Sequence, residues 1–256
     1  MDRAVSILQR VFALNRVASS RTEGLFPRTE PNAYDRFDTI VAAHLNARRN
    51  LVVVDVGAGR ECHFAPLLES GRGHTLIGVD VSADELAYND ALDERIVADA
   101  TAPLPFADAS VDLVVSSSTL EHLAQVQPFL QETHRILKPG GGAIHVFPSK
   151  FAPYSIINQV LPSRLSTRIV HLCVPDSDGV LGFPAFYDRT YARGMERLLA
   201  QCGFVVDACE VSYEQASFYF GMVYPAYLAV RLYEQAVRAV DARNLAAAVL
   251  LAAHKP

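Results

Sequence analysis

The stretch Leu51-Val52-Val53-Val54-Asp55-Val56-Gly57-Ala58-Gly59 decides the fold. Five of its first six residues are aliphatic and four of these are β-branched, which is typical of a strand buried on both faces of a parallel sheet. Glycine at the end of the strand permits a positive φ and lets a ligand approach the backbone closely. With a helix expected over residues 64–70, the stretch predicts a nucleotide site at the carboxyl end of a strand. The alternative is a plain tight turn between a buried strand and a helix.

Two features of this stretch bear on the charge of the ligand. A dinucleotide site has the pattern G-x-G-x-x-G, but Cys62 occupies the sixth position counted from Gly57. Asp55 lies inside the strand, two residues before the turn, where its carboxylate would not favour a pyrophosphate. A cationic ligand would gain from that carboxylate. The stretch therefore favours a nucleotide that carries a sulfonium over one that carries phosphates.

Composition and charge narrow the class of protein. The chain has 256 residues, half of them hydrophobic, which suffices for one large α/β domain with insertions. The net charge is −5 and there is no basic run, so we expect no nucleic-acid partner. We expect no metal site, and Cys62, Cys173, Cys202 and Cys209 are expected to be free thiols because their spacing fits no zinc site. No apolar run has the length of a membrane span or the character of a signal peptide, which predicts a cytoplasmic protein.

Strands and helices are expected to alternate along the chain, which predicts right-handed crossovers and a parallel sheet. After the first strand, strands are expected at residues 74–80, 95–100, 111–116, 143–148, 204–211 and 246–253. Helices are expected at residues 1–19, 34–48, 83–89, 123–137, 190–202 and 217–240, with a break or kink of the last one at Pro225 and a stop of the fourth at residues 138–142.

Two more acids follow expected strand ends. Asp80 lies about 20 residues after the glycines, where a carboxylate can accept hydrogen bonds from both ribose hydroxyls. Its alternative role is to cap the next helix, but Ser82 can do that as well. Asp99 can accept from an adenine amino group while Ala100 offers a backbone N–H, or Asp99 simply ends a strand. Parallel strands would bring all these positions to one edge of the sheet.

These residues, over positions 50–148, resemble the class I S-adenosylmethionine-dependent methyltransferases, specifically the methyltransferase type 11 group. The resemblance implies an α/β, Rossmann-like, seven-stranded and mostly parallel sheet with helices on both faces, an antiparallel last strand and helical insertions. One departure is Glu61, where the family often has a third glycine. The matching motifs are Asp55-Val-Gly-Ala-Gly59, Gly78-Val-Asp80-Val-Ser82, Ala98-Asp99-Ala100, Pro105-Phe106-Ala-Asp-Ala-Ser-Val-Asp112, Leu120-Glu-His-Leu123 and Arg135-Ile-Leu-Lys-Pro-Gly-Gly141.

The resemblance also implies roles for individual residues. Asp55 and the glycines would line the methionine half of S-adenosylmethionine, Asp80 would bind the ribose, and Asp99 the adenine. The serines at the end of the fourth strand would lie under the sulfonium. The full set of implied cofactor-binding residues is Asp55, Gly57, Ala58, Gly59, Asp80, Val81, Asp99, Ala100, Ser116 and Ser117.

Methyl transfer from a sulfonium requires that donor and acceptor be held in line, and a general base is needed only when the acceptor carries a proton. His122, His145 and Tyr154 are candidates for that base because they follow the fourth and fifth strands. For His122 the alternative is a residue that packs at the start of a helix. The sequence leaves the choice open.

We expect an N-terminal helix and linker at residues 1–33 and a methyltransferase domain at 34–256. Within it, residues 149–191 form an acceptor-site insertion with short helices at 155–160 and 165–172, and residues 215–244 form a helical insertion. Arg164 and Arg168 either recognise an acidic acceptor or are solvated. The first and last helices either pack as core or dimer contacts, or meet a membrane or a lipid-linked acceptor. A monomer and a homodimer are both compatible with the sequence.

The predicted activity is therefore methyl transfer from S-adenosylmethionine to a small-molecule or lipid-linked acceptor, at oxygen. The alternatives are an NAD(P)-dependent oxidoreductase and a non-catalytic, cofactor-binding partner module.

Overall fold

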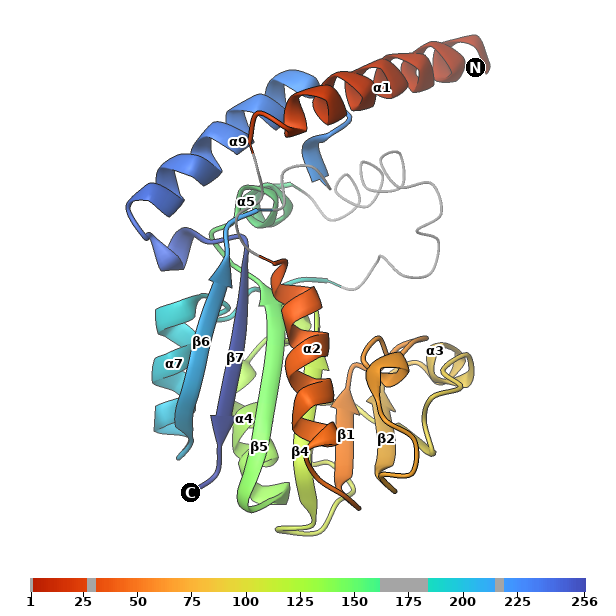
Figure 1. Ribbon diagram of the computed structural model, residues 1–256, viewed down its shortest axis with the longest axis vertical. Coiled ribbons are helices and arrows are strands. Elements are labelled where there is room, and N and C mark those ends of the chain that lie inside the picture. Colours follow the sequence, from red (N-terminus) through yellow and green to blue (C-terminus); the bar gives the residue numbers. More distant parts are fainter. Residues whose placement is uncertain (1, 27–30, 162–183, 215–218) are drawn as a thin grey trace.

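The centre of the molecule is a seven-stranded sheet with the strand order β3-β2-β1-β4-β5-β7-β6 (Figure 1). The computed structural model describes residues 2–26, 31–161, 184–214 and 219–256. All neighbouring strands pair in parallel except β7, which is antiparallel to both β5 and β6. This confirms the predicted fold, including the antiparallel last strand. The strands are β1 (Val52–Val56), β2 (Thr75–Asp80), β3 (Glu94–Val97), β4 (Val111–Ser117), β5 (Leu137–Pro148), β6 (Val205–Ser212) and β7 (Ala248–His254).

Helices cover both faces of the sheet. On one face, α2 contributes Phe37, Val41 and Leu45 to the core, while Phe129 of α4 and Leu198 of α7 belong to the core on the other face. Side chains alternate between the two faces along each strand, so the near-continuous aliphatic runs of β1 and β4 are buried on both sides. The helices are α1 (Asp2–Glu23), α2 (Ala33–Asn46), α3 (Ala83–Ala87), α4 (Val126–Ile136), α5 (Pro153–Val160), α7 (Ala192–Gln201) and α9 (Tyr224–Ala239), with 3-10 turns η1 (Ala65–Leu67), η2 (Leu120–His122) and η3 (Arg243–Leu245).

The carboxyl ends of β1, β2, β4 and β5 point to the same side of the molecule, and α5, α9 and α1 lie on that side (Figure 1). The hydroxyl of Ser19 in α1 donates to the carbonyl of Gly221, and Asn15 accepts from the N–H of Tyr224 at the start of α9. The guanidinium of Arg231 in α9 is buried and donates to the carbonyl of Phe26. These contacts hold the first and last helices together over the strand ends.

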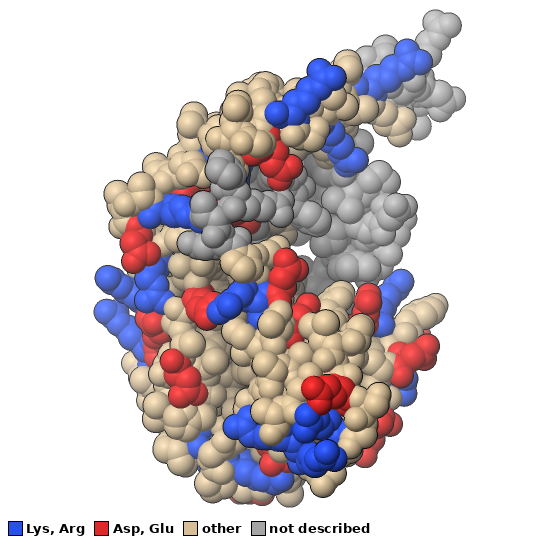
Figure 2. Space-filling model, in the orientation of Figure 1, with Lys and Arg blue, Asp and Glu red and all other residues tan. Residues whose placement is uncertain are grey.

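Surface charges of opposite sign lie close to one another. On the face that Figure 2 shows, the Lys and Arg side chains of the described residues are interspersed with Asp and Glu side chains. One such pair joins two elements, because Arg36 of α2 and Glu210 of β6 are 2.6 Å apart. A nucleic-acid backbone is bound by a continuous positive surface. The described part of this face does not offer one.

The sheet order reverses between β1 and β4, because β2 and β3 lie on one side of this pair and β5 on the other. A crevice outside the carboxyl ends of the strands at such a reversal is where open α/β sheets bind ligands. The fold therefore places Gly57, Asp80 and Ser117 around the position at which a ligand is expected.

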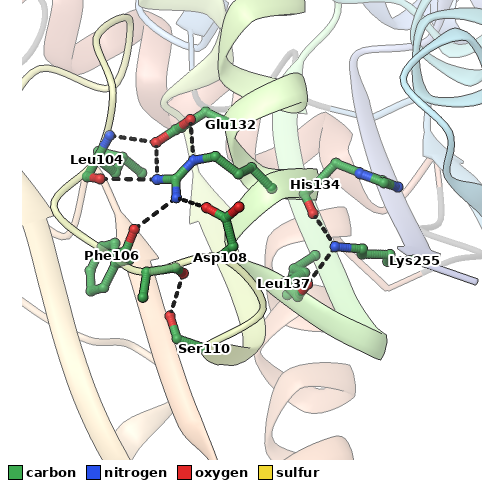
Figure 3. A network of polar contacts seen from close by, with 10 residues as sticks. Leu104, Phe106, Asp108, Ser110, Glu132, His134, Leu137 and Lys255 are labelled. Atoms are coloured by element: carbon green, nitrogen blue, oxygen red, sulfur yellow. Dashed lines mark hydrogen bonds and ion pairs between the residues drawn. The ribbon is translucent and has the colours of Figure 1, made fainter.

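One cluster of charged side chains serves the fold alone. Figure 3 shows the carboxylates of Glu132 and Asp108 and the carbonyl oxygens of Leu104 and Phe106 gathered around one guanidinium, which belongs to Arg135 of α4. The two ion pairs are 2.6 Å long and raise the pKa of Arg135. Arg135 thus fixes the loop that joins β3 to β4.

The expectation of a helix at residues 64–70 was wrong, because this segment forms only the 3-10 turn η1. Pro66 lies in that turn, and the ring of Phe64 packs edge-to-face against Phe37 of α2, with 6.5 Å between centroids. Helix α2 already covers this face of β1, so a second helix has no apolar surface left to cover there.

The helix stop expected at residues 138–142 is confirmed, because α4 ends at Ile136, but the glycine-rich segment is already part of β5, which was expected to begin only at residue 143. The N–H of Gly140 donates to the carbonyl of Lys255, and the N–H of Lys255 donates to Gly141. The ammonium of Lys255 also donates to the carbonyl oxygens of His134 and Leu137, as Figure 3 shows. The C-terminal segment thus supplies a hydrogen-bond partner that local sequence does not reveal.

Three further boundaries differ from expectation. Helix α1 continues to Glu23, four residues beyond its expected end at residue 19. The helix expected over residues 217–240 is interrupted at residues 221–223, and α9 begins at Tyr224; the expected break is thus present, with Pro225 in the first turn of α9, where a missing N–H costs nothing. Strand β3 ends at Val97, so Asp99 lies in the following turn.

Some expectations concern residues outside the described ranges. These are the helix expected at 165–172, the roles of Arg164 and Arg168, and the state of Cys173. Within the described residues, Cys62, Cys202 and Cys209 are free thiols.

Candidate active site

The glycine turn after β1 requires glycine for two reasons. Gly57 has a φ of 74° and Gly59 a φ of 51°, a region that L-residues other than Asn and Asp avoid. A Cβ on Gly57 would lie 2.2 Å from Oγ1 of Thr119, which donates to the carbonyl of Val56 at 3.0 Å. The backbone at the end of β1 is therefore packed directly against the segment that follows β4. This close approach forms the floor of the crevice.

Asp80 at the end of β2 holds the same turn. One carboxylate oxygen accepts from the N–H of Gly59 at 3.1 Å and the other from the N–H of Ser82 at 2.9 Å. Ser82, as expected, caps α3, because its hydroxyl accepts from the N–H of Glu85. A carboxylate has about four acceptor positions, so Asp80 retains capacity for the two hydroxyls of a ribose. The neighbouring Val81 is exposed.

Asp55 faces α2 and is almost completely buried. Burial, then the nearby charges of Asp80 and Asp38, raise the pKa of Asp55 to about 7. The pKa of Asp38 is also raised, chiefly by burial, while His63 opposes this shift. Acids of α2 and β2 thus act on the buried carboxyl group of β1, next to the glycine turn. Asp38 was missed in the sequence because it lies outside the glycine motif, on the flank of an amphipathic helix.

Asp99 and Ala100 lie in the turn after β3. Asp99 accepts from the N–H and the hydroxyl of Thr101, at 2.8 and 2.7 Å, and these bonds lower its pKa. The N–H of Ala98 donates to the carbonyl of Asp80, which keeps the ends of β2 and β3 side by side. Asp55, Asp80 and Asp99 consequently follow one another along the carboxyl rim of three neighbouring strands.

Ser116 and His145 are placed differently from the expectation. The hydroxyl of Ser116 and Nδ1 of His145 are 2.8 Å apart, both residues are fully buried, and the imidazole packs edge-to-face on Phe129 of α4. Burial lowers the pKa of His145 to about 4. An imidazole enclosed between the sheet and α4 does not reach an acceptor, so the structure argues against His145 as the general base. Ser117 lies one position further along, at the end of β4 and on the opposite face.

His122 and Tyr154 lie nearer the rim. Nδ1 of His122 is 3.1 Å from the carbonyl oxygen of Pro184, and burial lowers the pKa of this histidine. The hydroxyl of Tyr154 donates to the carbonyl of Ala247, and burial raises its pKa well above the ordinary value. Tyr154 therefore stays protonated at neutral pH and makes a poor base, whereas His122 is neutral and has Nε2 3.8 Å from Glu121.

Glu121 is the residue at the strand ends that sequence reasoning overlooked. It lies in η2 and is buried together with Leu120 and Leu123, and burial raises its pKa to about 8. The hydroxyls of Tyr34, Tyr187 and Tyr219 interact electrostatically with its carboxyl group. An acid inside the Leu120–Leu123 motif was visible in the sequence, but its burial was not, since that depends on α2 and on the segment after residue 184.

Within the part of the chain that the structure describes, no group of three His, Cys, Asp or Glu side chains is arranged to hold a metal ion. Among the same residues, no helix combines the length and the apolar character needed to cross a membrane.

Comparison with known proteins shows that the chain is similar to methyltransferases. The family profile for the methyltransferase domain matches residues 54–145. A malonyl-[acyl-carrier protein] O-methyltransferase of Coxiella burnetii is 43% identical over 91 residues, which cover 36% of this chain and 31% of that protein. An uncharacterised methyltransferase of Mycolicibacterium vanbaalenii is 32% identical over 145 residues, covering 50% of this chain and 56% of that protein. The chain thus spans about half, or less, of the length of the curated relatives it matches.

Solved structures share the fold at low sequence identity. A geranyl diphosphate methyltransferase bound to geranyl diphosphate and sinefungin superposes with a TM-score of 0.56 and 17% identity, covering 87% of this chain and 79% of that one. The [4+2]-cyclase SpnF superposes with the same TM-score at 18% identity, covering 87% and 80% of the two chains. A cyclase on this fold shows that the fold alone does not decide the reaction.

Proposed function

The chain belongs to the class I S-adenosylmethionine-dependent methyltransferases, and from this premise we propose that it transfers the methyl group of S-adenosylmethionine to an oxygen atom of a small-molecule or lipid-linked acceptor. The observation that carries the proposal is the group of acids at the glycine turn: Asp80 accepts from the N–H of Gly59, and Asp55 is buried within the electrostatic reach of Asp80 and Asp38. A ligand with a sulfonium and an ammonium group would relieve the mutual repulsion of these acids.

The same acids argue against an NAD(P)-dependent oxidoreductase. A pyrophosphate at the glycine turn would add two negative charges beside Asp55 and Asp80, whose proximity already raises the pKa of Asp55. The doubly wound dinucleotide fold has the parallel order 3-2-1-4-5-6, whereas here the antiparallel β7 is inserted between β5 and β6. Both differences favour the methyl donor over a dinucleotide.

Each group along the rim has a task in this reaction. Asp80 would accept from the ribose hydroxyls while it keeps Gly59 in place, and Asp99 and Ala100 would bind the adenine. Asp55 would balance the positive charge of the methionine half. Bound S-adenosylmethionine supplies an activated methyl group on sulfur, so the protein needs mainly to align the acceptor and exclude water.

One observation supports an oxygen acceptor and another supports an apolar one. The relative that is 43% identical over 91 residues is named as an O-methyltransferase. The helices over the strand ends expose large apolar side chains, among them Leu14 of α1 and Leu232 of α9, each more than 60% exposed. Such a surface suits an apolar or lipid-linked acceptor that approaches from this side.

Calorimetry with S-adenosylhomocysteine tests the first half of the proposal, with NAD as the competing ligand. Heat with S-adenosylhomocysteine and none with NAD is the expected result, and the reverse would decide for an oxidoreductase. The second half is tested by incubating the protein with cell extract and deuteromethyl-labelled donor, followed by mass spectrometry. A labelled methyl ether or ester supports the proposal; binding without any labelled product would favour a non-catalytic module.

A further inference from the structure

Among the described residues, Glu121 is a buried acid without a cationic partner. Within the same part of the chain, its Oε2 atom has no hydrogen-bond partner and no access to solvent. Nε2 of His122 lies 3.8 Å from Oε1, and the pKa of that histidine is lowered by burial. A buried carboxyl group without a compensating cation lowers the stability of the folded protein, which points to a functional role for Glu121.

Outside the glycine turn, two other acids with little solvent access have arginine partners. Glu234 forms an ion pair with Arg231 at 2.7 Å, and Glu214 pairs with Arg238 at 3.0 Å. The charges of these two acids are thus compensated by buried or half-buried cations. Glu121 departs from this pattern at the end of β4, next to the position where the sheet order reverses.

Tyrosines from separate parts of the chain surround this carboxyl group. Tyr34 comes from α2 and accepts a hydrogen bond from the hydroxyl of Ser118, and Tyr154 of α5 stacks on Tyr219 with 4.2 Å between ring centroids. Tyr187 precedes α7, and its backbone N–H donates to the carbonyl of Glu121. Each of these tyrosines interacts electrostatically with at least two of the others.

The tyrosine group is open to solvent on one side. Tyr219 is 42% exposed, while Tyr187 is 3% exposed and Glu121 4%. The tyrosine group therefore extends from the surface to a single buried carboxyl group. Such an arrangement suits a flat, apolar ligand with one polar group at its inner end.

We propose that Glu121 and the tyrosines Tyr34, Tyr154, Tyr187 and Tyr219 form the acceptor subsite, that the acceptor is an aromatic molecule with a free hydroxyl group, and that Glu121 takes the proton of this hydroxyl. The inference rests on the proposed function. The acceptor oxygen forms its bond to the methyl carbon as the carbon–sulfur bond breaks. Its proton passes to Oε2 of Glu121, and the sulfonium becomes a neutral thioether.

The geometry favours a hydroxyl over two other polar groups. A carboxylate acceptor would meet a buried carboxyl group and no described arginine or lysine, and it would need no base. A quaternary ammonium has no proton to give and no nucleophilic lone pair. A phenolic hydroxyl can donate a hydrogen bond to Glu121 and become the nucleophile once its proton leaves.

Calorimetry with four small probes tests the subsite in the protein saturated with S-adenosylhomocysteine, at pH 8.5. The probes are 4-methylphenol, its methyl ether 4-methylanisole, 4-methylbenzoate and benzyltrimethylammonium. We expect 4-methylphenol to bind at least tenfold more tightly than each of the others. In Glu121→Gln the preference for the phenol over its ether should fall below threefold, with unchanged affinity for S-adenosylhomocysteine.

Glu94→Gln is the matched control, because Glu94 is an exposed acid on the edge strand β3, and it should keep the full preference. Tighter binding of the benzoate or the ammonium, or no binding of 4-methylphenol by the unaltered protein, would overturn the inference. If Glu121→Gln fails to bind S-adenosylhomocysteine, the order of the probes on the unaltered protein decides. Failure of the unaltered protein to bind S-adenosylhomocysteine would instead refute the proposed function itself.

Discussion

Replacement of Gly57 by alanine should destabilise the protein through two separable effects. A φ of 74° costs an alanine roughly 1–2 kcal/mol. The new Cβ would also lie 2.2 Å from Oγ1 and 2.9 Å from Cγ2 of Thr119, so Thr119 must move and lose its hydrogen bond to Val56, which adds about 0.5–1.5 kcal/mol. The expected total is about 1.5–3.5 kcal/mol.

Thermal unfolding measures the combined effect. For a domain of this size, 1 kcal/mol corresponds to a shift of about 2–4 °C in Tm, so Gly57→Ala should lower Tm by roughly 3–14 °C. Gly59→Ala is the matched control: its φ is 51°, but the nearest atom to an added Cβ is 4.0 Å away. That variant should show the conformational cost alone, about 1–2 kcal/mol.

A double-mutant cycle separates the two effects. In a Thr119→Ala background the contacts to Oγ1 and Cγ2 are gone and only the Cβ of residue 119 remains, 3.1 Å from the added Cβ, so Gly57→Ala should there cost less than in the unaltered protein and approach the cost at Gly59, about 1–2 kcal/mol. If Gly57→Ala costs as much in that background as in the unaltered protein, the close approach between the ends of β1 and β4 does not limit the residue at position 57. The reasoning about the floor of the crevice would then be wrong.

Three further predictions concern the binding site. Asp80→Ala should weaken binding of S-adenosylhomocysteine by about 1.5–3 kcal/mol, the range for hydrogen bonds to a charged group, and an unchanged Kd in calorimetry would remove Asp80 from the site. The pKa of Asp55 is raised to about 7, so between about pH 4 and 7 its carboxyl group is protonated in the folded protein and ionised in the unfolded chain. The contribution of Asp55 to the free energy of unfolding is therefore lost as the pH rises through that window. Urea titrations at pH 5 and pH 8 should show this decline in the unaltered protein and a smaller decline in Asp55→Asn. In the same pH range, affinity for the cationic donor should rise in the unaltered protein and not in Asp55→Asn. The pKa of Glu121 is raised to about 8, so with this group as the base, kcat/KM for a phenolic acceptor should rise with pH through about 8. Glu121→Gln should lose this pH dependence. A kcat/KM that falls over the same range would indicate that protonated Glu121 acts as a hydrogen-bond donor.

The sequence alone determined the sheet and one edge of the site. Runs such as residues 51–56 are aliphatic on both faces, and only a strand between two layers of helices buries such a run completely. Asp55, Asp80 and Asp99 each stand at or near the end of such a strand, and the carboxyl ends of parallel strands share one edge. Positions that depend on strand periodicity and turn chemistry could therefore be predicted from the sequence.

The tertiary structure decided which polar groups are buried and what they face. Ser116 and His145 are two residues of neighbouring strands that face α4, and no local pattern distinguishes them from rim residues until the register of β4 and β5 is known. The pKa values of Asp38 and Glu121 are raised chiefly by burial, which arises only when the chain is folded. Burial and electrostatic coupling depend on contacts between segments that are distant in the chain, which is why the chemistry of the site could be located from the sequence but not assigned to individual groups.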